Sequence, residues 1–303
     1  MDHHQRDIRK GYGAALGAYV FWGVIPVYFK LVSALGPVEI VAHRVLWSLV
    51  LLLAIIGIGR RFALFRTHLF SRATIIPLSA TAALIAVNWM VYVLAVNSGH
   101  ILAASLGYFL NPLVSVMLGV VVLKERLRPA QAAAAMIAGM GATILLVSAL
   151  DTLWISLVLA LSFGFYGLVR KSAPVDALTG LGIETLLLAP PALAYVMYLG
   201  QDSVLTDSGV GLWLLIALSG VITSGPLLLF GYAARLLPLS TIGLLQYISP
   251  SILFLIGLLV YHEPLDGARL ASFIIIWIGL AVFTWDAVRA GRAARADWAR
   301  TSP

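Results

Sequence analysis

The chain has 303 residues, of which 61% are hydrophobic and only 11% are charged, whereas a soluble domain carries roughly 25% charged residues. This composition excludes a sizeable soluble domain and favours a membrane protein with a single body. The net charge of +7 does not indicate nucleic-acid binding, because the basic residues lie in loops beside apolar runs, where lipid headgroups attract them. The chain has no cysteine, so disulfides and thiolate metal sites are excluded, and we expect no cofactor and no metal.

Apolar runs of about 20 residues, the length that crosses a bilayer, recur along the chain. They are continuous rather than alternating, which predicts helices rather than the strands of a membrane barrel. The first run is full length and lacks a clear cleavage site, so we interpret it as a span and not as a signal peptide. We expect ten transmembrane helices, at 11–31, 37–57, 73–95, 102–123, 129–148, 153–170, 177–199, 209–233, 239–261 and 267–287.

The basic residues predict the orientation of these spans. With the N-terminus inside, the cytoplasmic loops and termini hold 17 of the 20 Lys and Arg residues, and only Lys30, Arg44 and Arg269 fall elsewhere. We therefore expect both termini in the cytoplasm. Residues 1–10 would form a cytoplasmic N-terminal segment and residues 288–303 a cytoplasmic tail.

A spacing of 13 residues occurs twice in the sequence. Asn111-Pro112 is followed at this spacing by Lys124-Glu125, and Ser249-Pro250 by His262-Glu263. Four identities keep the offset of 138 residues between the two copies, namely Gly119/Gly257, Val122/Val260, Leu127/Leu265 and Gly141/Gly279. The first copy ends in a basic segment and the second does not, which predicts opposite orientations in the membrane.

Five spans per half require the same inversion. We therefore expect an all-α integral membrane fold built as two inverted five-helix repeats, residues 11–148 and 153–287. Secondary transporters have this organisation and hold their substrate near the membrane midplane between the halves.

Ionisable side chains inside spans are costly, so each one is a candidate functional group. Glu39, His43 and Arg44 lie in the outer part of the second span, and Glu184 lies in the seventh, its repeat mate. One interpretation is a polar cavity with a titratable carboxylate for proton coupling, Glu184 first and Glu39 second. In the other, Glu39 is neutralised by Arg44 or Lys30, and His43 is a satisfied interior side chain. Glu184 is the stronger candidate because its own span has no basic residue.

The third and eighth spans each carry a weakly polar stripe at helical spacing. Thr81, Asn88 and Tyr92 lie on one, and Thr223 lies on the other. These side chains either line a cavity or form hydrogen bonds between helices, and both alternatives stay open. We expect Trp89 to face neighbouring helices or lipid.

Prolines predict breaks in the fourth and ninth spans, at Asn111-Pro112 and Ser249-Pro250. Tyr108, Gln246 and Tyr247 would bond the freed carbonyls or face substrate. Pro112 and Pro250 would act as hinges, or they would produce simple structural kinks.

The pattern of polar residues inside spans resembles one family. It is carried by residues 19–30 (YVFWGVIPVYFK), 39–48 (EIVAHRVLWS), 88–92 (NWMVY), 104–112 (ASLGYFLNP), 165–171 (FYGLVRK) and 243–250 (GLLQYISP). These segments resemble RarD-type permeases, in the EamA group of the drug/metabolite transporter superfamily, over roughly residues 10 to 287. The resemblance implies a ten-helix, two-repeat exporter or permease of the bacterial inner membrane.

We therefore expect a secondary transporter of small metabolites or drugs that works by alternating access, with proton coupling or exchange. A passive facilitator would have the same sequence features. A membrane-embedded enzyme is disfavoured, because the chain lacks a phosphate-binding loop, a zinc helix and a nucleophile elbow. The expected partners are a small-molecule substrate and the lipid bilayer, with the protein a monomer or homodimer.

Aromatic side chains outnumber charged ones among the candidate cavity residues, which favours small amphipathic solutes, such as amino acids or aromatic metabolites, over polyanions. The expected substrate-binding residues are Trp22, Tyr28, His43, Arg44, Asn88, Tyr92, Tyr108, Asn111, Tyr166, Thr223, Gln246 and Tyr247.

Overall fold

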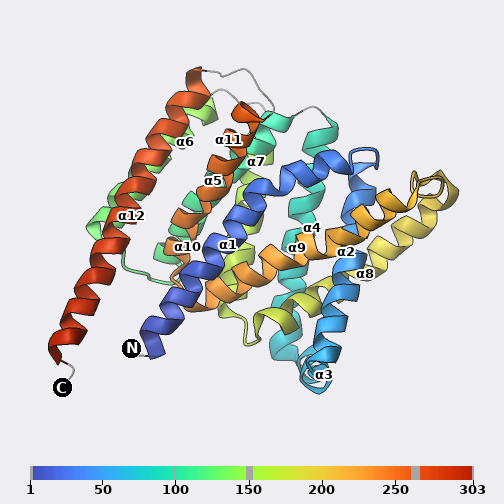
Figure 1. Ribbon diagram of the computed structural model, residues 1–303, viewed down its shortest axis with the longest axis horizontal. Helices are drawn as coiled ribbons and strands as arrows, with labels where there is room; N and C mark the ends of the chain where they lie inside the picture. Colours follow the sequence, from blue (N-terminus) through green and yellow to red (C-terminus); the bar gives the residue numbers. More distant parts are fainter. Residues whose placement is uncertain (1–2, 99, 148–152, 261–266, 302–303) are drawn as a thin grey trace.

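The computed structural model describes residues 3–98, 100–147, 153–260 and 267–301, and these residues form a bundle of α-helices (Figure 1). The elements are α1 (His3–Leu31), α2 (Pro37–Ile58), α3 (Phe62–Leu69), α4 (Arg72–Asn97), α5 (Ile101–Val121), α6 (Pro129–Val147), α7 (Leu153–Ser172), α8 (Ala177–Leu199), the 3₁₀ turn η2 (Gly200–Asp202), α9 (Val210–Leu236), α10 (Leu239–Gln246), α11 (Ile248–Leu259) and α12 (Gly267–Thr301). Helices suit this composition because each satisfies its own backbone polar groups in lipid.

Eight stretches of the described residues are long and apolar enough to cross a membrane. They lie in α1, α2, α4, α7, α8, α9, the pair α10 and α11, and α12. Helix α5 adds a shorter apolar stretch, Leu106–Val121. The all-helical membrane class is thus confirmed, while the number of ten spans stays a prediction.

Both ends of the chain lie on the same side of the bundle as α3 (Figure 1). Helix α1 begins at His3 and α12 continues to Thr301. The described residues of the expected N-terminal segment and C-terminal tail are therefore helical and extend the first and last spans. We call this side the terminal end of the bundle. The second copy of the 13-residue spacing ends at His262-Glu263, which lies outside the described residues.

Small residues allow α6 and α12 to pack closely along one side of the bundle (Figure 1). A Cβ atom at Gly141 would lie 2.9 Å from the Ser272 carbonyl oxygen, and one at Gly279 would lie 2.9 Å from the Ala134 carbonyl oxygen. Backbones that approach so closely gain van der Waals contact, the main source of helix association in lipid.

The two prolines that the sequence singles out have different effects. Helix α5 runs through Pro112 without interruption, so the predicted break at that position is wrong. The corresponding segment does break, at Tyr247 between α10 and α11. Pro250 has no N–H and its ring clashes with the carbonyl one turn back, which accounts for a break just before it. The Tyr247 carbonyl accepts from Ser251 Oγ at 2.8 Å.

Candidate functional site

Glu184 lies in the second turn of α8 and is only 2% exposed. Thr81 Oγ1 on α4 donates to Glu184 Oε1 at 2.5 Å, and the Tyr166 hydroxyl on α7 donates to Oε2 at 3.3 Å. Arg170, also on α7, places Nη1 3.6 Å from Oε1. The sequence gives Glu184 no basic residue in its own span, but the neighbouring helix supplies one. We call these four residues the Glu184 cluster.

Arg170 is the member of this cluster that sequence reasoning missed. Counting basic residues assigned it to a cytoplasmic loop, yet its side chain points into the bundle and is 2% exposed. Nη2 donates to the Ala177 carbonyl at 3.1 Å. Gly180 leaves room for the guanidinium, because a Cβ atom there would overlap Arg170 Nη1. In the sequence, the only indication of this arrangement is Gly180, four residues before Glu184, which leaves space for a large neighbouring side chain.

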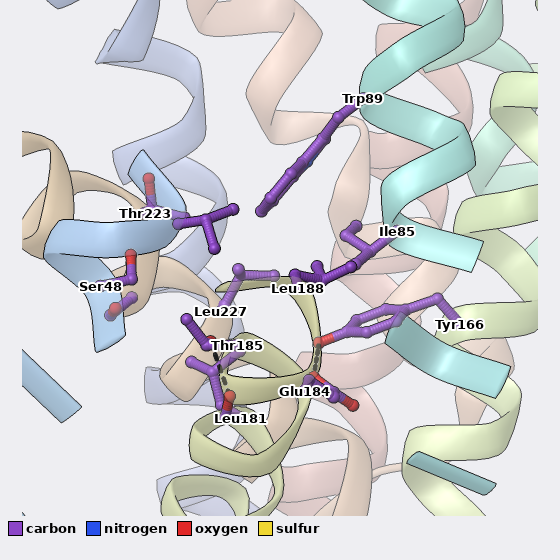
Figure 2. Close-up of a pocket in the computed structure, with 12 residues that line it drawn as sticks. Ser48, Ile85, Trp89, Tyr166, Leu181, Glu184, Thr185, Leu188, Thr223 and Leu227 are labelled. Carbon is purple, nitrogen blue, oxygen red and sulfur yellow. Dashed lines mark hydrogen bonds between the residues drawn. The ribbon is translucent and has the colours of Figure 1, made fainter. Parts of the chain in front are cut away.

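A small pocket lies against the Glu184 cluster (Figure 2). Its volume of about 10 Å³ holds on the order of one water molecule. Trp89 and Thr223 lie at the far side of this pocket from Glu184 in the view of Figure 2. The lining residues are Val45, Ser48, Ile85, Trp89, Tyr166, Leu181, Glu184, Thr185, Leu188, Thr223, Ser224 and Leu227. A pocket this small must widen before it admits an organic solute.

Arg44 on α2 lies beside the same pocket. Its Nε donates to Thr223 Oγ1 at 2.8 Å. The guanidinium carbon lies 4.9 Å from the centre of the Trp89 ring and 5.3 Å from the centre of the Phe29 ring, both within cation–π range. Among the described residues, no carboxylate lies within ion-pair distance of it, so the expected pairing with Glu39 does not occur. The Trp89 ring thus contacts Arg44 and the pocket.

Tyrosines complete the surroundings of Arg44. Tyr28, Tyr92 and Tyr108 all lie within electrostatic range of its guanidinium. Tyr92 and Tyr108 meet edge to face with ring centroids 6.1 Å apart, and Tyr108 is 41% exposed. The Tyr28 hydroxyl donates to the Leu215 carbonyl at 3.0 Å. We call Arg44, Phe29, Trp89, Tyr92 and Tyr108 the Arg44 site.

Glu39 and His43 lie on α2 before Arg44 but have other partners. Ser203 Oγ donates to Glu39 Oε1 at 2.5 Å. The His43 ring meets the Trp213 ring edge to face, with centroids 6.4 Å apart. Both side chains are buried, Glu39 where α2 meets the segment between α8 and α9 and His43 where α2 meets the start of α9. They therefore hold this end of the bundle together.

Two asparagines link helices to the backbone of α7. Asn88 Nδ2 donates to the Leu159 carbonyl and to Ser162 Oγ, both at 2.9 Å. With its amide nitrogen turned toward α7, Asn111 donates to the carbonyls of Leu159 at 3.2 Å and Ala160 at 3.1 Å. For both asparagines the hydrogen-bonding alternative fits the structure better than the cavity-lining one.

The remaining candidates lie in packed clusters. Trp22 contacts Phe163 and Phe230, with centroids 5.6 and 5.8 Å away, and both phenylalanines contact Tyr166. Tyr247 is buried in a separate cluster with residues of α5, α6 and α12. Gln246 is also buried. Trp22 and Tyr166 are thus brought together, while Gln246 and Tyr247 are not part of the Arg44 site.

At the terminal end, Glu125 ties the segment after α5 to the start of α10. Its carboxylate accepts from the Leu239 amide at 2.7 Å, the Ser240 amide at 2.9 Å and the Ser240 hydroxyl at 2.7 Å. Lys171 Nζ lies 4.0 Å away. A carboxylate at a helix N-terminus bonds amides that have no partner in the helix and is favoured by the helix dipole. We call these interactions the Glu125 contact.

Asp176, just before α8, makes a second connection at this end. Its Oδ1 accepts from the Thr179 amide at 3.2 Å and lies 3.4 Å from Arg61 Nη1. Partial burial acts to raise the pKa of this carboxyl, but the Thr179 hydrogen bonds and the Arg61 charge outweigh it, so the pKa lies below its usual value.

A bundle of apolar helices with buried charges beside an interior pocket defines a multi-pass membrane protein of the transporter type. Residues 9–147 match the model of the EamA-like transporter family. Protein RarD of Streptomyces exfoliatus is 42% identical over 305 residues, covering 99% of this chain and 96% of the relative. Protein RarD of Escherichia coli is 40% identical over 285 residues, covering 93% and 96%.

An uncharacterized transporter of Vibrio cholerae is 42% identical and covers 97% of this chain and 98% of the relative. One crystal structure superposes with a TM-score of 0.70 at 18% identity, covering 93% of this chain and 98% of that one, and supports the fold. The chain belongs to the EamA-like transporter family and is RarD-like. It is therefore a membrane transporter and not an enzyme.

Proposed function

We propose that the protein is a proton-coupled secondary transporter of small organic solutes that works by alternating access. The observation that carries this proposal is the buried Glu184 cluster, which lines a small interior pocket beside the half-buried charge of Arg44. Titratable groups buried within spans are characteristic of proton pathways. The chain has no phosphate-binding loop for an ATP motor.

We further propose ten spans in two inverted repeats with both termini cytoplasmic. The helix contacts support this arrangement because they occur in pairs related by exchanging repeat mates. The proposed mates are α1 with α7, α2 with α8, α4 with α9, α5 with α10 and α11, and α6 with α12. Helix α1 packs on α9, and the corresponding mates, α7 and α4, also pack on each other. The contact of α1 with α10 and α11 corresponds in the same way to the contact of α7 with α5. The contact of α2 with α9 corresponds to the contact of α8 with α4. The mates α2 and α8 contact each other, as do α6 and α12.

Two features support alternating access. The pocket has room for about one water molecule, so solute must enter through a different conformation. The Glu125 contact joins a segment of the first proposed repeat to a helix of the second. Breaking that contact would separate the halves at the terminal end, and its re-formation would close them.

Glu184 is the proposed proton carrier. The ionised form is compensated by Arg170, and the protonated form retains the hydrogen-bond partners Thr81 and Tyr166. Movement of α7 relative to α8 would separate Glu184 from Arg170 and favour proton uptake, because an unpaired buried carboxylate is costly. Proton binding would thereby be linked to helix movement.

The test is a pH series of flux in liposomes with Glu184→Gln, which keeps the shape of the side chain but cannot titrate. We expect exchange without a gradient to persist while accumulation driven by a pH gradient is lost. Thr81→Val is the matched control, because it removes one hydrogen bond and leaves the carboxylate free to titrate. Unchanged pH dependence in Glu184→Gln would eliminate Glu184 as the carrier. If the flux through the unmodified protein does not depend on the pH gradient, the protein is instead a passive facilitator.

A further inference from the structure

We infer that the Arg44 site binds the carboxylate of a small aromatic or apolar organic acid, with Arg44 as the anion-binding residue. The inference rests on the proposed function, in that it takes the interior pocket to be the substrate site. It adds the charge and chemical class of the substrate.

The first step is the state of the Arg44 guanidinium. A guanidinium has five N–H donors, and Nε is the one that bonds Thr223. Among the residues that the structure describes, no carboxylate lies within 4.0 Å of any Arg44 nitrogen. Arg170 shows the contrast, because it has Glu184 beside it. A charge in the interior of a membrane protein is costly unless it is paired, so Arg44 is poised to accept an anion.

The second step is the composition of the wall around Arg44. Trp89 and Phe29 lie close to the guanidinium carbon and present their ring surfaces to it. Tyr92 and Tyr108 add two further rings, which meet edge to face. A solute that places an anionic group on Arg44 therefore meets aromatic surface with the rest of its body. Such rings recognise flat or apolar groups.

The third step is the number of charges. Arg44 is one cation, and a phosphate ester or a dicarboxylate would need a second. The planar guanidinium matches a single carboxylate in a two-pronged geometry. Glu184 lines the pocket beside the Arg44 site but already has Arg170, Thr81 and Tyr166 as partners, so an ammonium group on the solute is not required. The substrate class that fits is a monocarboxylate with an aromatic or apolar body.

The experiment uses four compounds that share one ring and differ in charge. They are 3-phenylpropionate, 3-phenylpropanol, 3-phenylpropylamine and phenylalanine. Binding to the purified full-length protein in detergent is measured from the shift of the unfolding temperature with concentration, which depends on the dissociation constant. We expect 3-phenylpropionate to stabilise the protein and the alcohol and the amine to have no effect. Binding of phenylalanine alone, or equal binding of the alcohol, would overturn the inference.

Variants test the role of Arg44 itself. Arg44→Gln should weaken 3-phenylpropionate binding by roughly 30-fold or more, the range seen when a buried charge loses its partner. Arg44→Lys should weaken it by a smaller factor, because the charge remains and the two-pronged geometry is lost. Should Arg44→Gln not fold, Thr223→Val decides, since it removes the hydrogen bond that orients Arg44 and should weaken binding several-fold. Unchanged binding in Arg44→Lys and Thr223→Val would contradict the assignment.

The design separates this inference from the proposed function. Binding in detergent requires no transport, whereas flux in liposomes does. Binding of 3-phenylpropionate through Arg44 without proton-dependent flux would leave the site in place and remove the transport mechanism. Proton-dependent flux of another solute, with none of the four compounds bound, would support the transport mechanism and rule out the assignment of the Arg44 site.

Discussion

The Glu125 contact allows a quantitative prediction about opening at the terminal end. Glu125→Ala removes three hydrogen bonds to a carboxylate, each of which contributes about 1.5–3 kcal/mol when the group is charged. In the open state water replaces most of them, and the Glu125 side chain is already 14% exposed. We therefore expect a net shift of about 2 kcal/mol toward the open state, on the order of 30-fold in population.

The absence of native cysteine makes this shift measurable. Ser224 lines the pocket and its hydroxyl is buried without a hydrogen-bond partner among the described residues, so Ser224→Cys is a nearly isosteric probe. The rate of its reaction with a small impermeant thiol reagent reports how often the pocket opens. We expect a rate about 30-fold higher in the Glu125→Ala background when reagent is applied from the terminal end.

Glu125→Gln is the matched control, because it keeps the length of the side chain and one acceptor oxygen. We expect an intermediate rate. Equal rates in the parent and Glu125→Ala backgrounds would show that the Glu125 contact does not hold the two halves together. A faster reaction only from the opposite end would show the same.

Three further changes follow from the structure. Cysteine placed at the exposed Thr206 should react with an impermeant reagent in intact cells, and cysteine at Thr67 on α3 only after permeabilisation; the reverse would refute cytoplasmic termini. Pro250→Ala should slow liposome flux more than Pro112→Ala, because the chain breaks at Tyr247 just before Pro250 whereas α5 is continuous through Pro112, and equal rates would remove the hinge role. Asp176→Ala should lower thermal stability near neutral pH by about 1 kcal/mol, as loss of a helix cap does, and Asp176→Asn should restore most of it. Folding lowers the pKa of Asp176, so its ionised form stabilises the folded protein above the ordinary pKa near 3.8. The parent protein should therefore lose its extra stability over Asp176→Asn as the pH falls below 3.8.

The membrane fold could be predicted because continuous apolar runs leave helices as the main solution in lipid. The placement of Glu184 and Arg44 in the interior of the bundle followed from the same pattern, since both lie within apolar spans, although Arg44 is only half-buried. Their partners did not follow. Arg170 is in the last turn of α7, next to a loop in the sequence, and only the tertiary structure brings its side chain to Glu184 on α8.

Two other differences have the same origin in packing. Asn88 and Trp89 are adjacent in α4, and the sequence favours Asn88 as the residue that binds substrate and places Trp89 against neighbouring helices or lipid. In the structure Trp89 lines the pocket, while Asn88 bonds α7. Pro112 and Pro250 are equivalent in the repeat, yet α5 stays continuous at one and the chain breaks at Tyr247 near the other. The tertiary surroundings of each proline, and not the proline alone, decide between a kink and a break.

The close pairing of α6 with α12 has a practical consequence. This pair contacts α5, α10 and α11, whereas Arg44 and Glu184 lie on α2 and α8. The outer surface of the pair is apolar and suited to contact with lipid, with exposed side chains at Met136 and Met140 on α6 and at Ile274 and Ile278 on α12. Helix α12 also continues to Thr301, well past the apolar stretch Leu270–Ala290. A rigid helical fusion that extends α12 could therefore carry a fiducial domain for electron cryomicroscopy while leaving the solute pathway free to move.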